Sequence, residues 1–90
     1  MKYDFQASET FWKKFYRLSP EQKESVRLAW TIFKENPFDP RLGTHRINSL
    51  SAHYKKTIYS LVIESDLRAV FYCEGNTVRT IDIGSHSVYK

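Results

Sequence analysis

The sequence predicts an α+β domain in which an N-terminal strand and a helical hairpin pack on one face of a small antiparallel β-sheet. Two observations predict this class. Apolar residues recur at helical spacing over residues 9–36, and they alternate with polar residues, as in strands, from residue 57 onward. The chain has 90 residues, which is enough for one hydrophobic core, so residues 1–90 are expected to form a single domain.

The first strand and the first helix follow from local patterns. Residues 2–6 alternate, with Tyr3 and Phe5 on one side, as expected for a short strand. Ser8 is a suitable N-cap for a helix that begins at Glu9. The apolar stripe of this helix consists of Phe11, Trp12, Phe15, Tyr16 and Leu18.

The start of the second helix is the clearest local signal. Ser19 and Gln22 have the spacing of a capping box, and Pro20 occupies the first helical position, where proline is favoured. This helix is expected to stop near Asn36, because Pro37 disfavours helical backbone at the residue before it. The apolar face consists of Val26, Ala29, Trp30 and Phe33. Two helices joined by almost no loop form an αα-hairpin.

The second half of the chain is predicted to be mainly strands. Residues 45–50 are compatible with a strand and residues 49–53 with a loop. The segments 57–63, 67–73 and 77–83 are rich in β-formers and are separated by short turns, so they are expected to form an antiparallel meander.

The segment 67–73 divides its side chains between two faces. Leu67, Ala69, Phe71 and Cys73 alternate with Arg68, Val70 and Tyr72. If the helices cover the first set, Arg68 and Tyr72 project from an open face, where a cation and a phenol are tolerated. Arg79 lies close in the sheet, but its face depends on the register of the last hairpin, which the pattern leaves open.

Composition excludes several classes of protein. A hydrophobic fraction of 41% and a charged fraction of 27% are typical of a folded chain and not of a disordered one. The apolar runs are too short to cross a bilayer and no secretory signal is evident, so a cytoplasmic protein without membrane contact is expected. Cys73 is the single cysteine, which excludes an intramolecular disulfide and a cysteine-based metal site.

The charge distribution points to an anionic partner. The net charge is +4, and residues 40–63 contain no carboxylate. The positively charged and titratable residues of this segment are Arg41, His45, Arg46, His53, Lys55 and Lys56. Such a field attracts phosphates, and tyrosines among cations suit RNA, whose bases stack on aromatic rings. A solvated loop bearing lysines explains the same charges without any partner.

Four segments, taken in order, carry a resemblance to a known family: ETFWKKFYRL, NPFDPRLGTHRI, YSLVIESDLRAVFY and TIDIGSHSVYK. The last contains a Gly-x-His-x-x-Tyr pattern at residues 84–89. Over essentially its whole length, the chain resembles the RelE/ParE superfamily of bacterial type II toxins, and in particular its RelE- and YafQ-like mRNA endonucleases. The order of the elements carries this resemblance more than any single motif.

The resemblance implies a ribosome-dependent mRNA endonuclease that is neutralised by a cognate antitoxin. Such toxins enter the ribosomal A site and activate the 2′-OH of the mRNA against the adjacent phosphate, without a metal or other cofactor. Catalysis then requires a base, an acid and cations around the phosphorane. Imidazole suits the proton transfers because its ordinary pKa lies near neutrality.

The resemblance also implies roles for individual residues. His86 matches the C-terminal catalytic histidine, and Arg68 matches the strand arginine that neutralises the scissile phosphate. Tyr89 stands where a terminal aromatic contacts the base or assists proton transfer. His45 resembles an upstream histidine of YafQ-like members, and Asp66 an acidic residue before the central strand. The expected RNA contacts are Arg46, His53, Lys55, Lys56, Tyr72 and Arg79.

The sequence departs from the family pattern at two places. The YafQ-like histidine on the strand before the turn is absent from residues 60–62, and Asp82 stands near the position of an expected arginine. Two other interpretations therefore stay open, and with them whether the protein is an enzyme. One is a ParE-like toxin that binds a topoisomerase without catalysis. The other is a catalytically inactive RelE-fold protein that only binds a partner or RNA.

Overall fold

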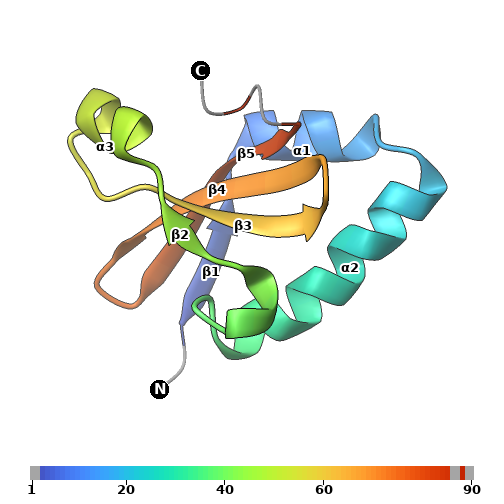
Figure 1. The fold of residues 1–90 in the computed structure, drawn as a ribbon, viewed down its shortest axis with the longest axis horizontal. Coiled ribbons are helices and arrows are strands. Elements are labelled where there is room, and N and C mark those ends of the chain that lie inside the picture. The colour runs from blue at the N-terminus through green and yellow to red at the C-terminus, as the bar shows by residue number, and fades with distance from the viewer. Residues whose placement is uncertain (1–2, 86–87, 89–90) are drawn as a thin grey trace.

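A mixed β-sheet forms the centre of the molecule (Figure 1). The computed structural model describes residues 3–85 and 88, and within them five strands are ordered β1-β5-β4-β3-β2. The strands are β1 (Asp4–Ala7), β2 (His45–Arg46), β3 (Tyr59–Glu64), β4 (Leu67–Glu74) and β5 (Thr77–Gly84). The helices are α1 (Glu9–Tyr16), α2 (Pro20–Glu35), the short 3₁₀ helix η1 (Pro40–Leu42) and α3 (Asn48–Tyr54).

Both predicted helix caps are confirmed. The Ser8 side chain accepts a hydrogen bond from the Phe11 amide, and α1 begins directly after it. Ser19 and Gln22 form the complete capping box, with each side chain accepting from the backbone amide of the other residue. α2 ends at Glu35. This agrees with the end near Asn36 that Pro37 predicts.

The helical hairpin covers one face of the sheet, called here the first face. Phe11, Val26 and Phe33 of the hairpin form one core with Leu61, Leu67, Ala69, Phe71, Val78 and Ile83 of the strands. This confirms the predicted architecture and the predicted alternation of β4. The opposite side of the sheet, called here the second face, carries Arg68, Val70 and Tyr72.

The N-terminal strand makes the sheet mixed. β1 runs parallel to β5, with Phe5 opposite Val78, whereas the other strand pairs are antiparallel. Two backbone hydrogen bonds mark its ends, from the Asp4 amide to the Asn76 carbonyl and from the Ser8 amide to the Thr80 carbonyl. Alternation in the sequence indicates which side chains share a face but carries no information about the pairing partner or its direction.

The prediction for residues 45–53 is wrong. The structure has a strand of two residues, His45–Arg46, and then helix α3 in place of the strand over 45–50 and the loop over 49–53. Ile47, Leu50 and Tyr54 have the i, i+3, i+7 spacing of a helix, which indicates this element in retrospect. Figure 1 shows α3 on the left of the sheet and α2 on the right.

A buried serine joins α3 to β3. The Ser51 hydroxyl donates to the Ile47 carbonyl and accepts from the Ile58 amide, each at 2.8 Å. Leu50, Ile58, Val70 and Val88 form a second core beneath the helix. α3 therefore covers part of the second face, which is less open than the sequence suggested.

No helix in the described part of the chain has the length and apolarity that a membrane span requires.

We expect Ser51→Ala to lower the free energy of unfolding by about 1–3 kcal/mol, because it leaves the buried Ile58 amide without an acceptor. Chemical denaturation measures this loss. Ser49→Ala is the matched control, since Ser49 is exposed on the same helix. Equal effects of the two substitutions would contradict a bridging role for Ser51.

Candidate functional site

The register of the sheet brings several predicted site residues onto the second face. His45 of β2 lies opposite Ser60 of β3, Ser60 opposite Val70 of β4, and Val70 opposite Asp82 of β5. With strands about 4.8 Å apart, this row spans about 14 Å. Arg68 lies two residues along β4 from Val70, so its side chain points to the same face.

Arg68 is positioned at the start of β4, and part of its donor capacity has no partner among the described residues. Its Nη2 donates to the Ser65 carbonyl at 2.8 Å, whereas its Nε is buried and has no hydrogen-bond partner. Among residues 3–85 and 88, Arg68 forms no ion pair. A guanidinium held in this way can donate to an anionic ligand such as a phosphate.

The C-terminal strand ends beside this arginine. Gly84 lies opposite Arg68, and a Cβ added at Gly84 would come within 2.9 Å of the Val88 side chain. Glycine therefore permits the close approach of Val88, which packs into the second core. His86 and Tyr89, the two C-terminal residues expected in catalysis, lie outside the described residues.

His45 and Asp66 occupy exposed positions on two different sides of Arg68. The Nδ1 atom of His45 lies 2.9 Å from the Gly43 carbonyl oxygen, and the residue belongs to the edge strand β2. Asp66 lies in the turn between β3 and β4, two residues before Arg68. The structure thus places His45 on the second face and Asp66 at its border.

Three of the expected RNA contacts gather around a carboxylate. Lys56 Nζ lies 2.7 Å from Glu74 Oε2 and 4.9 Å from the centre of the Tyr72 ring. Arg79 lies directly opposite Tyr72, which fixes its face, and its Nε donates to Glu74 Oε1 at 3.1 Å. Gln6 also accepts a hydrogen bond from Arg79. These cations are therefore partly neutralised.

The pKa values of this cluster reflect the same contacts. The Lys56 hydrogen bond lowers the pKa of the Glu74 carboxyl, and Glu74 in turn raises the pKa of the Lys56 ammonium. Tyr72 lies four residues along β4 from Arg68, a distance of about 13 Å in a strand. The Glu74 cluster and Arg68 are consequently separate cationic regions of one face.

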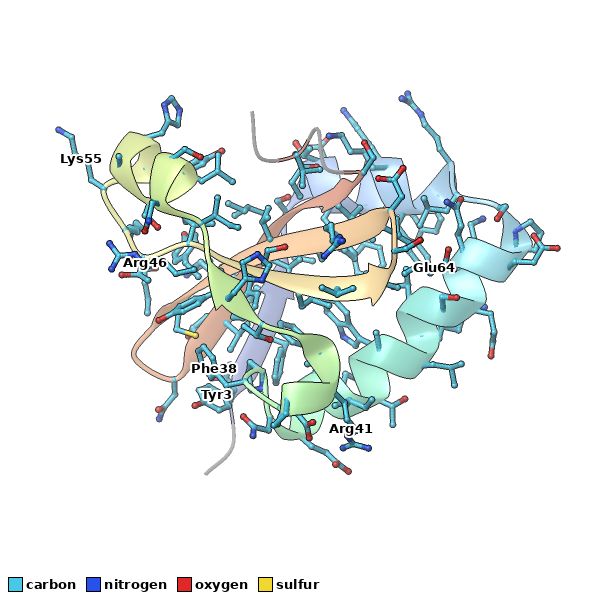
Figure 2. All side chains as sticks on the ribbon, in the orientation of Figure 1. Tyr3, Phe38, Arg41, Arg46, Lys55 and Glu64 are labelled. Carbon is cyan, nitrogen blue, oxygen red and sulfur yellow. The ribbon has the colours of Figure 1, made fainter. Side chains whose placement is uncertain are left out.

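A second group of expected RNA contacts lines a shallow depression beside α3. Arg46, Lys55 and Lys56 border a hollow of about 330 Å³. Figure 2 shows Arg46 and Lys55 on the same side of the molecule. Arg46 lies opposite Tyr59, whose ring packs on the core beneath the helical hairpin. Arg46 therefore belongs to the first face of the sheet, whereas its neighbour His45 belongs to the second face.

His53, the remaining expected RNA contact, borders a different pocket. This pocket lies between α3 and β5 and has a volume of about 430 Å³. Its described lining consists of Ser49, Leu50, His53, Tyr54, Val70, Ile81, Asp82 and Val88. Within residues 3–85 and 88, no group of three or more His, Cys, Asp or Glu side chains is arranged to hold a metal ion.

Sequence reasoning missed Glu74 and, on α3, Tyr54. Glu74 approaches Lys56 from 18 positions away in the chain, a separation for which no local pattern exists. Its contact with Arg79 follows from the tight β4–β5 hairpin, because Glu74 and Arg79 lie on the two strands close to the turn. Tyr54 was missed because it ends helix α3, where the sequence predicted a strand over residues 45–50 and a loop over residues 49–53.

Comparison with known proteins identifies the fold. No family model and no curated protein matches the sequence. Solved structures match over nearly the whole chain. A chain of the archaeal RelE–RelB complex from Pyrococcus horikoshii OT3 superimposes with a TM-score of 0.74 at 10% identity, covering 94% of this chain and 96% of that chain. The chain has the RelE fold.

Two further structures agree. A chain of the E. coli DinJ–YafQ toxin–antitoxin complex has a TM-score of 0.72 at 14% identity and covers 98% of this chain and 97% of its own. The YoeB/ParE toxin from Agrobacterium tumefaciens has a TM-score of 0.70 at 18% identity, with coverages of 92% and 98%. The fold expected from the family resemblance is confirmed, and at these identities the roles of individual residues rest on their geometry.

We expect Glu74→Gln to raise the affinity for single-stranded RNA about two- to fivefold at low salt, with the difference shrinking as salt rises. The reason is that Lys56 and Arg79 lose their shared carboxylate. Fluorescence anisotropy with a labelled oligonucleotide measures the change.

Glu24→Gln is the matched control for this experiment. It makes the same change in net charge, but Glu24 pairs with Arg27 on α2. An equal gain in both variants would show that net charge alone sets RNA affinity and would contradict a specific role for the Glu74 cluster.

Proposed function

We propose that the protein is the toxin of a type II toxin–antitoxin system and that it cleaves mRNA in the ribosomal A site. The observation that carries this proposal is the guanidinium of Arg68. It lies on the second face, forms no ion pair among the described residues and keeps a buried Nε–H without an acceptor. It also lies opposite Gly84, two residues before His86. Arg68 can bind an anion, and the chain beside it continues from Gly84 to the imidazole-bearing residue His86. This combination suits phosphate chemistry.

The proposed reaction is an attack within the RNA strand. The 2′-oxygen bonds to the adjacent phosphorus, the bond from phosphorus to the 5′-oxygen breaks, and a cyclic phosphate and a 5′-hydroxyl result. Arg68 stabilises the charge that develops on the phosphoryl oxygens. His86 transfers a proton, either from the 2′-OH or to the leaving 5′-oxygen, and His45 is the candidate for the complementary transfer.

The other expected residues position the RNA in this proposal. Tyr89 contacts a base or assists proton transfer, and Asp66 orients groups at the border of the second face. Arg46 and Lys55 form no ion pairs within the described part of the chain, so their charge is available to the phosphate backbone. Lys56, Tyr72 and Arg79 contribute less electrostatic attraction, because Glu74 offsets the two cations.

We expect Arg68→Gln and His86→Ala each to reduce cleavage by about 100-fold or more, since each removes a group that acts on the transition state. The measurement is the mapping of mRNA 5′ ends on translating ribosomes after induction. Arg27→Gln serves as the control, because it removes a guanidinium from the exposed side of α2.

Full cleavage by the Arg68 and His86 variants would remove these residues from the mechanism. Intact mRNA with the wild-type protein would remove the nuclease proposal altogether. A DNA-damage response with intact mRNA would then indicate the topoisomerase-binding alternative, and unaffected growth the inactive binding protein.

We also propose that the partner is a cognate antitoxin with an acidic, amphipathic segment. Two of the similar structures are complexes of RelE with RelB and of YafQ with DinJ. In this chain a groove of about 480 Å³ lies on the helical hairpin. Trp12 and Tyr16 line it with 44% and 66% of their surfaces exposed, and Arg27 and Lys34 also border it. Exposed aromatic rings with cations beside them fit a helix that has an apolar face and acidic flanks.

We expect Trp12→Ser to weaken binding of the antitoxin about 30-fold, the effect of losing an aromatic anchor. Calorimetry with the product of an adjacent acidic reading frame measures the affinity. Leu28→Ser is the matched control, because Leu28 is 63% exposed on α2 but does not line the groove. Equal losses in both variants, or an affinity that does not fall with salt, would contradict this binding mode.

A further inference from the structure

The pocket between α3 and β5 has features that the proposed cleavage chemistry does not use. It borders the second face but is lined by neither Arg68 nor His45. Its volume of about 430 Å³ lies in the range typical of small-ligand sites. Its floor is apolar and its walls are polar or aromatic, which is the composition that orients a flat, partly polar ligand.

A β-bulge builds one wall of this pocket. Val70 pairs with Asp82 and Phe71 pairs with Thr80, so Ile81 is an extra residue on β5. A bulge of this kind directs two successive side chains to the same side of the sheet. Ile81 and Asp82 therefore both line the pocket, although strict alternation would separate them.

The opposite wall is aromatic. His53 and Tyr54 lie at the end of α3, with their ring centres 5.0 Å apart in an edge-to-face arrangement. Tyr54 is 47% exposed, so part of its ring is available for stacking. Leu50, Val70 and Val88 supply the apolar floor. Proteins hold the unstacked bases of single-stranded RNA in this way, by stacking them on aromatic rings.

Asp82 provides the polar specificity of the pocket. Its Oδ1 accepts a hydrogen bond from the Ile83 amide at 2.8 Å and forms an ion pair with Lys14 Nζ, also at 2.8 Å. Among the residues that the structure describes, no hydrogen bond ends on Oδ2, so this oxygen keeps both its lone pairs for a ligand. An ionised carboxylate accepts hydrogen bonds and donates none, so it selects a ligand edge rich in N–H donors.

We propose that this pocket receives an unstacked guanine of the bound RNA. Guanine is the RNA base that presents two adjacent donors, N1–H and the 2-amino group, on its Watson–Crick edge. Adenine and cytosine each present one amino group beside an acceptor nitrogen, and uracil flanks its one N–H with two carbonyls. The ring stacks against Tyr54 and His53, and its donors face Asp82.

This inference rests on the proposed function, for which it specifies the base preference. It also gives a reason for the carboxylate at position 82. A negative charge is unfavourable beside a phosphate, but it is favourable beside the donor edge of a base. Asp82 thus belongs to base recognition, and Arg68 to phosphate recognition.

The test measures binding and needs neither ribosomes nor cleavage. Four single-stranded RNA pentamers that differ only in a central G, A, C or U are titrated into the purified protein, followed by fluorescence anisotropy. We expect the G pentamer to bind about tenfold more tightly than the others. In Asp82→Asn this preference falls to about twofold or less, because the amide replaces one acceptor oxygen by a donor.

Lys14→Gln is the matched control. It removes the ion pair with Asp82 but leaves the carboxylate and the bulge, so the preference for G persists. Thermal unfolding of both variants separates loss of recognition from loss of folding. Equal binding of the four pentamers by the wild-type protein, or an unchanged preference in Asp82→Asn, overturns the inference.

A further titration distinguishes the two sources of guanine. Guanosine monophosphate is expected to bind far more weakly than the G pentamer, because it lacks the backbone contacts. Equal affinities would assign the pocket to a free nucleotide and overturn its role in RNA recognition. A G preference in a protein that leaves mRNA intact supports the inference while contradicting the nuclease proposal. Cleavage of mRNA without a G preference in binding supports the nuclease proposal while contradicting the inference.

Discussion

Burial of one face of the sheet is the constraint on which the rest of the structure depends. Phe33 of the helical hairpin packs against Phe71 of β4, and Phe11 belongs to the same core, so the first face of that strand is buried. Because side chains alternate along a strand, the residues on either side of Phe71 must face the other way. Arg68 and Tyr72 therefore lie on the second face, where both are partly exposed, and a shift of β4 by one residue would turn the guanidinium toward the helical hairpin.

The second face carries a cation without an ion pair among the described residues and two cations that a carboxylate neutralises. Arg68 forms no ion pair among the described residues, whereas Glu74 pairs with Lys56 and Arg79 at the other end of β4. Arg46 and Lys55, which form no ion pair among the described residues, lie at the sheet edge beside α3. Under the proposed function, RNA affinity is expected to come from the sheet edge and from Arg68, with the Glu74 cluster limiting non-specific binding. Net charge alone would have assigned equal weight to all five cations.

Much of the fold could be predicted from the sequence, because its signals are local. Ser19 and Gln22 specify a helix start by their spacing alone, and the alternation of residues 67–73 specifies which side chains meet the hairpin. α3 was missed because Ile47 at its N-cap provides no side-chain cap, and because it packs on Ile58, just before β3, and on Val70 of β4. Such contacts have no local signature.

The site was predictable only in part, for the same reason. The face of Arg68 follows from alternation, but the face of Arg79 depends on its pairing with Tyr72. The bulge at Ile81 reverses the alternation of β5 and brings Asp82 into the α3 pocket. Neither feature can be read from composition or spacing, since both depend on how two strands align.

The central claim is that Arg68 and His86 act on one phosphate of the RNA. The most direct measurement is an NMR titration of the side-chain nitrogen signals with a short RNA whose 2′-hydroxyl groups are methylated, which binds but cannot react. We expect the Arg68 Nε–H and the His86 ring to shift together, with one midpoint, while the side chain of Arg27 stays unchanged. An unchanged Arg68 signal, or different midpoints for the two groups, would contradict the claim.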